Sequence, residues 1–566
     1  MISEVILVIQ LAVSVVMGVY FYTMLRGRRT HKQNMQVESK KQVQRLEKLR
    51  SISLNVPLSE KTRPQQFNEI IGQREGVTAL CAALCGENPQ HVLIYGPPGV
   101  GKTCAARLVM DRAKRSGISP FRPDAKFVEM DATCIRYDER NIADPLIGCV
   151  HDPIYQGAGA YGVAGIPQPK EGAVTKAHGG ILFLDEIGEL HPFHINKLLK
   201  VLEDRCVFFD SAYYNCNDKE TPRHVHEIFA RGMPADFRLV GATTKSPREI
   251  SPAIRSRCME IFFRPLYPEE LILIARNAAN KAGYCIDADA AANIGEYATN
   301  GREAVNMVQM AAGLAREQGG TAIRAGHIQW VVETGKYARR PVPRLGGNSS
   351  GCVNGLAVYG SNIGMIIEIE TVAVRSENPS LTVTGLVDEE EVGFDSRRFR
   401  RKSTSRSSVE NVLTALKKNF GVNPGEYYIH INMPGSAPID GPSAGVAIAV
   451  SVYSALTGCV VCPGIAMTGE ISINGNVRAV GGVAAKIIAA RRAGATTVLV
   501  PAENMAEAAI VSESIRVIGV SHIGEVMRVA FGTDRTEKHE TVLSAAGEDQ
   551  MILTSLNSVA SHDVSV

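Results

Sequence analysis

The most informative residues in the first half of the chain form a glycine-rich loop that ends in a lysine and a threonine. The loop fits the pattern GxxxxGK[ST], follows an apolar strand at Val92–Tyr95 and precedes a helical pattern. Glycines let backbone N–H groups surround phosphate oxygens, the lysine adds a positive charge, and the threonine hydroxyl can ligate Mg²⁺. We therefore predict a nucleoside triphosphate site. Its residues are Gly96, Pro97, Pro98, Gly99, Val100, Gly101, Lys102 and Thr103.

Two acidic residues follow a second apolar strand, Ile181–Leu184. A carboxylate at the carboxyl end of a strand beside a phosphate loop can complete a Mg²⁺ shell. We therefore predict that Asp185 shares the metal with Thr103 and that Glu186 polarises the attacking water. Two ordinary surface acids are the alternative, which the phosphate loop upstream makes less attractive.

A serine and a lysine in the second half of the chain suggest a different chemistry. Ser443 lies among small residues in the run PIDGPSAG at an expected helix start, where backbone N–H groups can stabilise an oxyanion. Lys486 follows 43 positions later among apolar residues. Burial lowers a lysine pKa, so its neutral amine can serve as the base for a serine nucleophile. Taken singly, Ser443 is more often a helix cap and Lys486 a surface lysine.

Length and composition place these motifs in a multidomain globular chain. At 566 residues the protein needs about three domains. A formal net charge of +3 and 6% aromatic residues give little support to a nucleic-acid partner. The twelve cysteines lack zinc-like pairs of pairs and indicate a reducing compartment. Cys81 and Cys85 are interpreted as buried thiols on one helix face, and the CxxC at 459–462 is given no redox or metal role.

The first thirty residues contain an uncharged, mostly apolar run, Val5–Leu25. As a helix its 21 residues cover about 30 Å, the thickness of a bilayer core. Glu4 precedes the run, whereas Arg26, Arg28, Arg29 and Lys32 follow it. The positive-inside rule therefore predicts one membrane span with all later residues in the cytoplasm. A cleaved signal peptide fits less well, because the start is acidic and the exit is bulky.

One short stretch is strongly basic. A solvated or interfacial loop is the favoured interpretation, and a patch that binds a polyanion is the alternative. The residues concerned are Arg397, Arg398, Arg400, Arg401, Lys402 and Arg406.

The order of motifs in the first half resembles the AAA+ family. That resemblance makes Thr244, or Thr243, the residue that senses the γ-phosphate after the strand that begins at Arg238. It also makes Arg257, with Arg255 as the alternative, an arginine finger given to a neighbouring subunit, and Arg302 the second sensor in a helical lid. In the glycine-rich segment 155–165, Tyr161 and Val163 are candidate pore-loop residues, with a plain surface loop as the alternative.

The second half resembles the Lon peptidase family. The matching motifs are PxDGPSAG around Ser443, MTGEI from Met467 to Ile471, and GG-x₃-K ending at Lys486. The resemblance implies a Ser443 nucleophile, a Lys486 general base and a Thr468 that orients the amine. It also implies that Asp440 is structural rather than catalytic. Ile439 replaces the lysine of many relatives.

The long amino-terminal substrate-binding region of soluble Lon is absent, and an apolar helix stands in its place. The chain is therefore most similar to B-type Lon proteins, in particular the short version of spore-forming bacilli.

These observations predict an α/β AAA+ domain with a helical lid, then an α+β peptidase domain, after one transmembrane helix. The expected segments are an anchor at 1–30, a polar stalk at 31–60, the nucleotide-binding domain at 61–267, the lid at 268–338, a linker at 339–350, the peptidase domain at 351–537 and a tail at 538–566.

The resemblance implies an ATP-dependent serine endopeptidase that uses ATP and Mg²⁺. Protein substrates, a homo-hexamer and the cell membrane are the expected partners. An AAA+ chaperone with an inactive Lon-like domain is the main alternative, and a nucleic-acid motor is a third. The pair Ser443 and Lys486 argues against both, because neither activity requires it.

Overall fold

The computed structural model divides the chain into two compact units, residues 1–61 and 62–566, which we describe separately. It describes residues 14–21, 41–52, 54, 56–135, 144–151, 167–211, 214–218, 221–340, 344–347, 349–359, 363–385, 389–392, 399–402, 404–434, 442–509, 511 and 515–532.

The amino-terminal unit is helical where it is described, at residues 14–21 and 41–51 and in α2 (Leu58–Lys61). The apolar side chains in 15–21 are exposed. Within the described ranges, no helix reaches the length and apolarity needed to span a bilayer. Most of the predicted span, Val5–Leu25, lies outside the described residues, so the membrane anchor stays a prediction.

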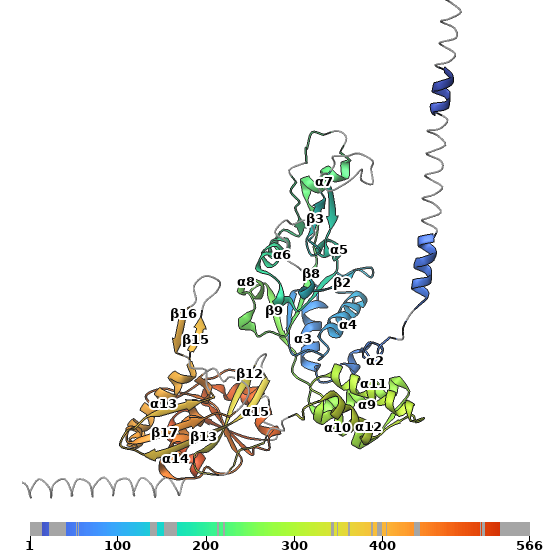
Figure 1. Ribbon diagram of the computed structural model, residues 1–566. Helices are drawn as coiled ribbons and strands as arrows, with labels where there is room; N and C mark the ends of the chain where they lie inside the picture. Colours follow the sequence, from blue (N-terminus) through green and yellow to red (C-terminus); the bar gives the residue numbers. More distant parts are fainter. Residues whose placement is uncertain are drawn as a thin grey trace, which may run out of the picture. The chain divides into compact units, whose positions relative to one another are not determined.

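The second unit begins with a parallel five-stranded sheet in the order β2-β5-β8-β1-β9 (Figure 1). Its strands are short and apolar, which suits a parallel sheet covered by helices. Their carboxyl ends share one edge of the sheet, where ligands bind in open α/β folds. The strands are β1 (His91–Tyr95), β2 (Phe127–Asp131), β5 (Ile181–Asp185), β8 (Arg238–Thr243) and β9 (Cys258–Phe262).

Helices and two small hairpins surround this sheet. The helices are α3 (Arg74–Leu84), α4 (Lys102–Arg115), α5 (Ala173–Lys176), α6 (Pro192–Asp204), α7 (Arg223–Arg231) and α8 (Pro252–Arg255). The hairpins pair β3 (Gly148–His151) with β4 (Gln168–Glu171), and β6 (Cys206–Val207) with β7 (Met233–Pro234). The pore-loop candidates Tyr161 and Val163 fall between β3 and β4, outside the described residues.

Four helices follow β9 and pack on one another as a separate cluster (Figure 1). Alanines at their contacts, such as Ala275, Ala291 and Ala311, are fully buried and let the helices approach closely. The cluster has the position and content expected of the helical lid. It contains α9 (Pro268–Ala282), α10 (Ala288–Tyr297), α11 (Gly301–Glu317) and α12 (Ala325–Gly335), with the strand pair β10 (Cys285–Ile286) and β11 (Ala322–Ile323).

The last part of the chain is built on a mixed seven-stranded sheet in the order β14-β17-β13-β12-β18-β21-β22. Its β12–β13–β17 part is antiparallel, whereas β12, β18, β21 and β22 are mutually parallel. The predicted α+β arrangement therefore applies to the first half of this sheet only, because the second half alternates strand and helix. The strands are β12 (Cys352–Tyr359), β13 (Ile363–Arg375), β14 (Leu381–Thr384), β17 (Tyr427–Asn432), β18 (Ile465–Met467), β21 (Thr497–Pro501) and β22 (Arg516–Val520).

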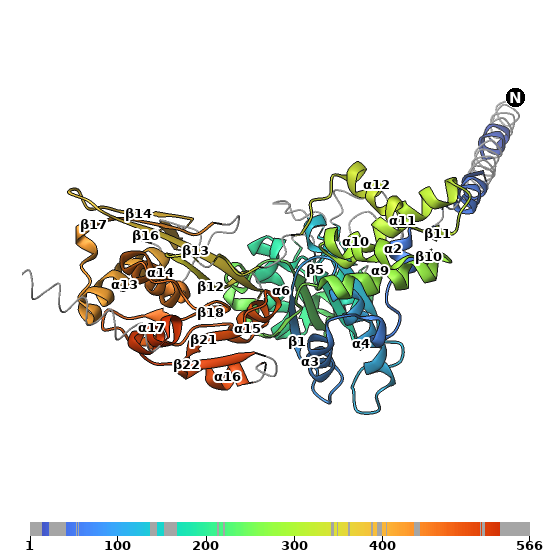
Figure 2. The same ribbon diagram turned by 90° about the horizontal axis from the view of Figure 1, so that it is seen from below.

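Helix α14 (Gly445–Thr457) forms the centre of this domain. Its first ten residues are all buried, which fits its apolar sequence on every side. It packs on β12 and β13 and against α13 (Thr404–Phe420) and α17 (Ile523–Phe531) (Figure 2). The remaining elements are α15 (Val483–Arg492), α16 (Met505–Ala509) and the pair β19 (Glu470–Ile471) and β20 (Val477–Arg478).

The predicted basic stretch lies partly in a two-stranded hairpin. Strand β16 (Phe399–Lys402) pairs with β15 (Glu389–Val392), and the register sets Glu391 opposite Arg400, Glu390 opposite Arg401 and Glu389 opposite Lys402. The register concerns the backbone pairing, so the solvated or interfacial loop and the polyanion patch both stay predictions.

Candidate nucleotide and peptidase sites

The phosphate loop leaves β1 through a glycine that no other residue can replace easily. Gly96 has φ 156°, and a Cβ there would lie 2.5 Å from the backbone oxygen of Phe263. Its N–H donates to the carbonyl of Thr243 at 3.1 Å, which ties the loop to β8. The loop then turns into α4 through Gly101, whose φ of 97° is in the left-handed region. These residues therefore fit a nucleotide phosphate group in the way the motif requires.

Lys102 is buried at the start of α4, with 7% of its surface exposed. Its amine donates to the carbonyl oxygens of Gly96, Pro97 and Thr243. Burial lowers the pKa of this lysine, whereas the carboxylates of Glu186 and Asp185 oppose that change. The amine is thus held at the sheet edge among partners that favour its charged form.

The two predicted acids stand at the end of β5, next to β8. Burial, and then the charge of Glu186, raises the pKa of Asp185. Glu186 adopts a left-handed backbone with φ 48°. Its carboxylate accepts hydrogen bonds from both the N–H and the hydroxyl of Thr244 at 3.0 Å. Thr244 therefore contacts the predicted water-activating residue directly, whereas the Thr243 hydroxyl accepts from the N–H of Lys245.

The two candidate arginine fingers have different partners. Arg255 makes two hydrogen bonds to Glu260, at 2.6 and 3.3 Å, and Tyr95 donates to the same carboxylate at 2.9 Å. Arg257 makes an exposed ion pair with Glu203 and donates to the carbonyl of Ala253. A bidentate pair holds Arg255 within its own chain. This difference favours Arg257 as the residue that can reach a neighbouring subunit.

The lid reaches the phosphate loop at the start of α11. The N–H of Gly301 donates to the carbonyl of Gly99 at 3.2 Å, and the side chain of Asn300 accepts from the N–H of Glu303. Arg302, the predicted second sensor, is exposed at this helix start. Burial raises the pKa of the Cys104 thiol, and the Arg302 charge is among those that oppose the rise. The role of Arg302 as second sensor stays a prediction.

The predicted nucleophile lies in a short turn, η7 (Pro442–Ala444), that leads into α14. The carbonyl of Ser443 accepts from the N–H of Gly469 at 2.9 Å and from the hydroxyl of Thr468 at 3.1 Å. Both donors follow β18, so the central sheet fixes the backbone of the serine. Asp440 falls outside the described residues.

Lys486 points its amine at the same threonine. The amine donates to the Thr468 hydroxyl at 3.1 Å, and Thr468 is fully buried while Lys486 is 2% exposed. Burial lowers the pKa of Lys486 to about 8, against the opposing charge of Glu507. Among the described contacts, no hydrogen bond joins the Ser443 hydroxyl to this amine; such catalytic bonds often tighten only when substrate binds. The arrangement can supply a neutral amine beside a serine nucleophile.

A glycine that the sequence did not single out lets α15 approach the sheet. A Cβ on Gly364 of β13 would lie 2.0 Å from the carbonyl oxygen of Ala485 and 3.0 Å from the N–H nitrogen of Lys486. Only a glycine permits this contact. Nothing in the local sequence indicates it, because Gly364 and Lys486 are distant in the chain.

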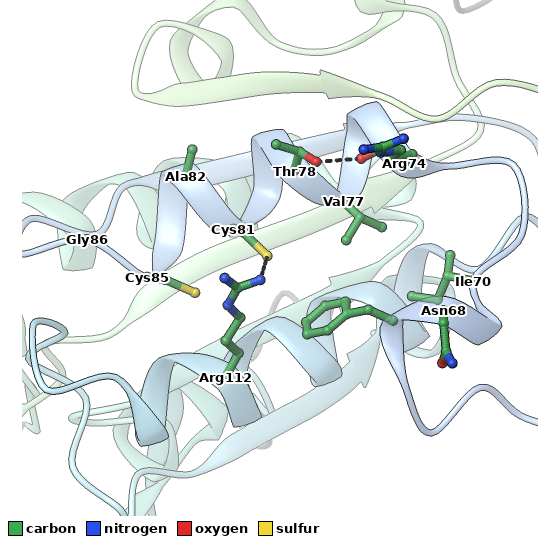
Figure 3. A pocket seen from close by; sticks show the side chains of 11 residues that line it. Asn68, Ile70, Arg74, Val77, Thr78, Cys81, Ala82, Cys85, Gly86 and Arg112 are labelled. Carbon is green, nitrogen blue, oxygen red and sulfur yellow. Dashed lines mark hydrogen bonds between the residues drawn. The ribbon is translucent and has the colours of Figure 1, made fainter.

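A hollow of about 770 Å³ lies away from both sites, along α3 and α4. Cys81 and Cys85 line it, and Arg112 reaches Cys81 from α4 (Figure 3). The prediction that these thiols are buried was wrong, since both are partly exposed. The twelve cysteines are free thiols in the structure. Burial raises the pKa of Cys85 to about 11, which favours the protonated thiol.

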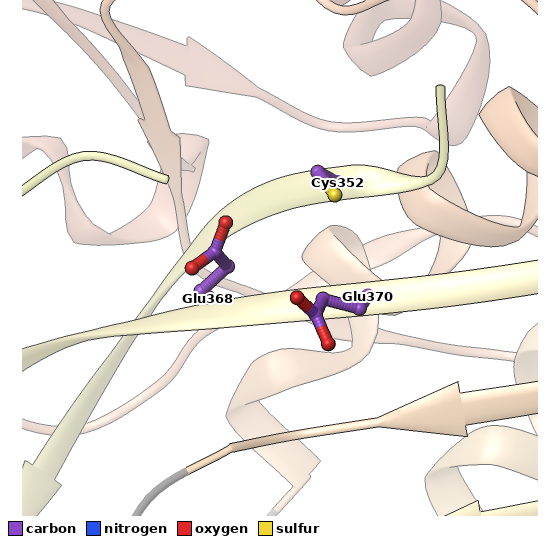
Figure 4. A group of neighbouring side chains, drawn as sticks. All are labelled: Cys352, Glu368 and Glu370. Carbon is purple, nitrogen blue, oxygen red and sulfur yellow. The ribbon is translucent and has the colours of Figure 1, made fainter. Parts of the chain in front are cut away.

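Three further side chains have metal-ligand chemistry, on β12 and β13 (Figure 4). Cys352, Glu368 and Glu370 have ligand atoms within 4.8 Å of one another. Each already has a partner in the protein: Ser349 donates to Cys352, the N–H of Gly347 to Glu368, and Asn432 to Glu370. We therefore assign no metal to this cluster.

Comparisons with known families agree with this division of the chain. Residues 334–533 match the family described as "Lon protease (S16) C-terminal proteolytic domain". Residues 70–208, which include the phosphate loop and β5, match the family described as "Sigma-54 interaction domain". The second match supports an AAA-type ATPase fold in this part of the chain.

Similar proteins cover different shares of the sequence. Lon protease 2 of Bacillus subtilis (strain 168) is 52% identical over 534 residues, which cover 94% of this chain and 97% of that protein. Archaeal Lon protease of Methanothermobacter thermautotrophicus is 27% identical over 437 residues, 69% of this chain and 64% of that protein. Lon protease 1 of Herpetosiphon aurantiacus is 38% identical over 153 residues, 26% of this chain and 19% of that protein. The chain belongs to the Lon protease family of ATP-dependent serine endopeptidases.

Proposed function

We propose that this chain is a membrane-anchored, homo-hexameric Lon protease of the B type, which unfolds proteins with ATP and cleaves them with Ser443 and Lys486. The observation that carries the proposal is the buried contact from the Lys486 amine through Thr468 to Ser443. It lies in the same chain as a complete phosphate loop. A chaperone with an inactive peptidase domain has no need for a buried lysine at this place.

In the proposed cleavage, the Ser443 hydroxyl attacks the peptide carbonyl carbon and its proton passes to the neutral Lys486 amine. The lysine returns that proton to the departing amine of the substrate, which leaves an ester on Ser443. Water then attacks the ester, and Lys486 again takes and returns the proton. Thr468 keeps the amine directed at the serine because its hydroxyl also bonds the serine carbonyl.

In the proposed motor, the phosphate loop and Lys102 bind the phosphates of ATP, and Thr103 and Asp185 would hold its Mg²⁺. The metal would neutralise charge on the phosphates. Glu186 orients water once Thr244 releases its carboxylate. Arg257 would leave Glu203 to act on the nucleotide of the next subunit, which makes hydrolysis depend on a ring.

The membrane location rests on the sequence alone. The apolar run Val5–Leu25 and the arginines after it support a single span with the catalytic domains in the cytoplasm. Lon protease 2 of Bacillus subtilis aligns with 94% of this chain and over 97% of its own length, so the two proteins have similar lengths.

Tyr161 and Val163 remain candidate pore-loop residues, which would contact protein substrates.

The proposal can be tested with the purified chain, one folded protein substrate and one short unfolded peptide. The wild type should degrade the protein only with ATP and Mg²⁺. Ser443→Ala should keep ATP hydrolysis and retain undegraded protein. ATP hydrolysis without cleavage of either substrate by the wild type would instead favour the chaperone.

The membrane anchor needs a separate test, because it does not depend on catalysis. Deleting residues 1–30 should move the chain from the membrane fraction to the soluble fraction and leave its ATP hydrolysis in place. Recovery of the truncated chain only with membranes would contradict the single anchor.

A further inference from the structure

The helix that carries Lys486 begins without a cap of its own. Its first residue follows Gly482, which has a left-handed φ of 68° and no side chain to accept a hydrogen bond. The first N–H groups of a helix need acceptors from elsewhere, and their partial positive charge disfavours a nearby ammonium. Lys486 lies only one turn into this helix. What caps α15 therefore affects both the position and the charge of the amine.

The cap comes from the segment η8 (Ala502–Asn504) and α16. The Glu507 carboxylate accepts from the N–H of Ala484, in the first turn of α15, at 3.1 Å. Just before the helix, Asn504 both accepts from the N–H of Val480 and donates to its carbonyl. Glu503 accepts from the N–H of Ala479 at 3.3 Å. Three side chains, those of Glu503, Asn504 and Glu507, thus hold the approach to α15 and its first turn.

Glu507 also differs from its neighbours in its electrostatic effect. Burial lowers the pKa of Lys486, and Glu507 is the group whose charge opposes that change. The elements packed on α15 are β12, β13, β21 and α16. Among the described side chains of these elements and of α15 itself, no other ionisable group contributes to this change in the pKa of Lys486. Those groups are Cys352, Glu368, Glu370, Arg375, Arg491 and Arg492.

We propose that Glu507 is a positioning residue for the catalytic lysine: its carboxylate caps the turn that carries Lys486 and sets the pH above which the peptidase is active. This inference rests on the proposed role of Lys486 as general base. It assigns Glu507 no contact with substrate. A purely structural cap would hold the helix equally well with or without a charge.

Glu507→Gln separates the two effects, because the amide keeps an acceptor oxygen for Ala484 and loses the charge. Without that charge the lysine loses its proton at lower pH. The acid limb of the pH profile of peptide kcat/KM should therefore move to lower pH, by roughly half a unit or more. Activity at the foot of the limb should rise about threefold or more relative to the plateau. Glu503→Gln is the matched control, since Glu503 has the same type of bond, and its limb should stay in place.

A second readout does not need catalysis. In the Ser443→Ala background, cyanate should carbamylate the neutral Lys486 amine, and mass spectrometry can follow this reaction across pH. Its midpoint should fall in Ser443→Ala/Glu507→Gln relative to Ser443→Ala alone. Glu507→Asp, which keeps the charge, should leave the midpoint at the wild-type value even if it melts at a lower temperature.

The outcomes separate this inference from the proposed function. If Lys486→Ala is inactive but Glu507→Gln moves neither the acid limb nor the carbamylation midpoint, the role of Glu507 is wrong and the dyad stands. If carbamylation shifts while the activity limb does not, Lys486 is not the base, and the proposed mechanism fails instead. A shift in both, absent from Glu503→Gln, supports the inference.

Discussion

The chain contains two buried lysines, Lys102 and Lys486, whose surroundings suit different roles. Lys102 lies among three backbone carbonyls and near two carboxylates, which favour its ammonium form. Lys486 is more buried, donates to one hydroxyl and has a pKa of about 8. Burial lowers the pKa of both lysines, and two carboxylates oppose that change at Lys102, against one at Lys486. The same residue type thus serves as a fixed charge in one site and as a base in the other.

The largest predicted effect comes from replacing Lys486 with arginine, whose side chain is a permanent cation. We predict that Lys486→Arg lowers peptide cleavage about 10⁴-fold, because a guanidinium does not deprotonate here. Ser443→Ala should cause the same loss, since removing either member of a catalytic pair abolishes the function of both. ATP hydrolysis should not change. Peptidase assays from pH 6 to 10 check this, and substantial turnover anywhere in that range would mean that another group is the base.

The two candidate arginines provide a test of how the motor site is completed. We predict that Arg257→Ala lowers ATP hydrolysis about 10³-fold, because it removes charge stabilisation at a neighbour's site. Arg255→Ala should instead cost about 1 kcal/mol of unfolding free energy, since it breaks the pair with Glu260. Mixing Arg257→Ala with Lys102→Ala subunits should restore part of the hydrolysis. A monomer with full specific ATPase activity would contradict the shared site.

For the first lysine, we predict that Lys102→Ala lowers ATP hydrolysis about 10²- to 10³-fold, since a preorganised charge at the phosphates is lost. Degradation of a folded protein should stop with it. Cleavage of a short unfolded peptide should survive in part, because Ser443 and Lys486 lie in a separate domain. An unchanged rate of folded-protein degradation would show that this loop does not drive the motor.

The two sites also differ in how far the sequence could predict them. The phosphate loop is contiguous, and its flanking strand was recognisable as a short apolar run, so the local pattern located β1, the loop and α4 correctly. The strands at 181–185 and 238–243 were recognisable for the same reason. The burial of Lys486 followed from its apolar neighbours.

The supporting residues of the peptidase site could not be predicted in this way. Thr468 came from the family resemblance, whereas Gly364 and Glu507 gave no local signal. They reach Lys486 only through the sheet and through α16, and such contacts depend on the tertiary fold rather than on spacing. The acidic strand opposite Arg400–Lys402 was missed because a charge pattern says nothing about register.

The smallest expected effect tests one of these unpredicted contacts. A Cβ at Gly364 would collide with the backbone of α15, which cannot yield as a flexible side chain would. We predict that Gly364→Ala displaces the turn that carries Lys486 and lowers peptide kcat/KM about tenfold, with some loss of stability, because small misplacements of a catalytic group reduce rates steeply. Gly481→Ala is the control, since its added Cβ would meet no atom within 4 Å. ATP hydrolysis should stay constant in both variants, because the phosphate loop belongs to a separate domain. A peptidase rate in Gly364→Ala equal to that of the control would mean that α15 accommodates the methyl group, and that the position of the base tolerates more movement than the close packing of strand and helix implies.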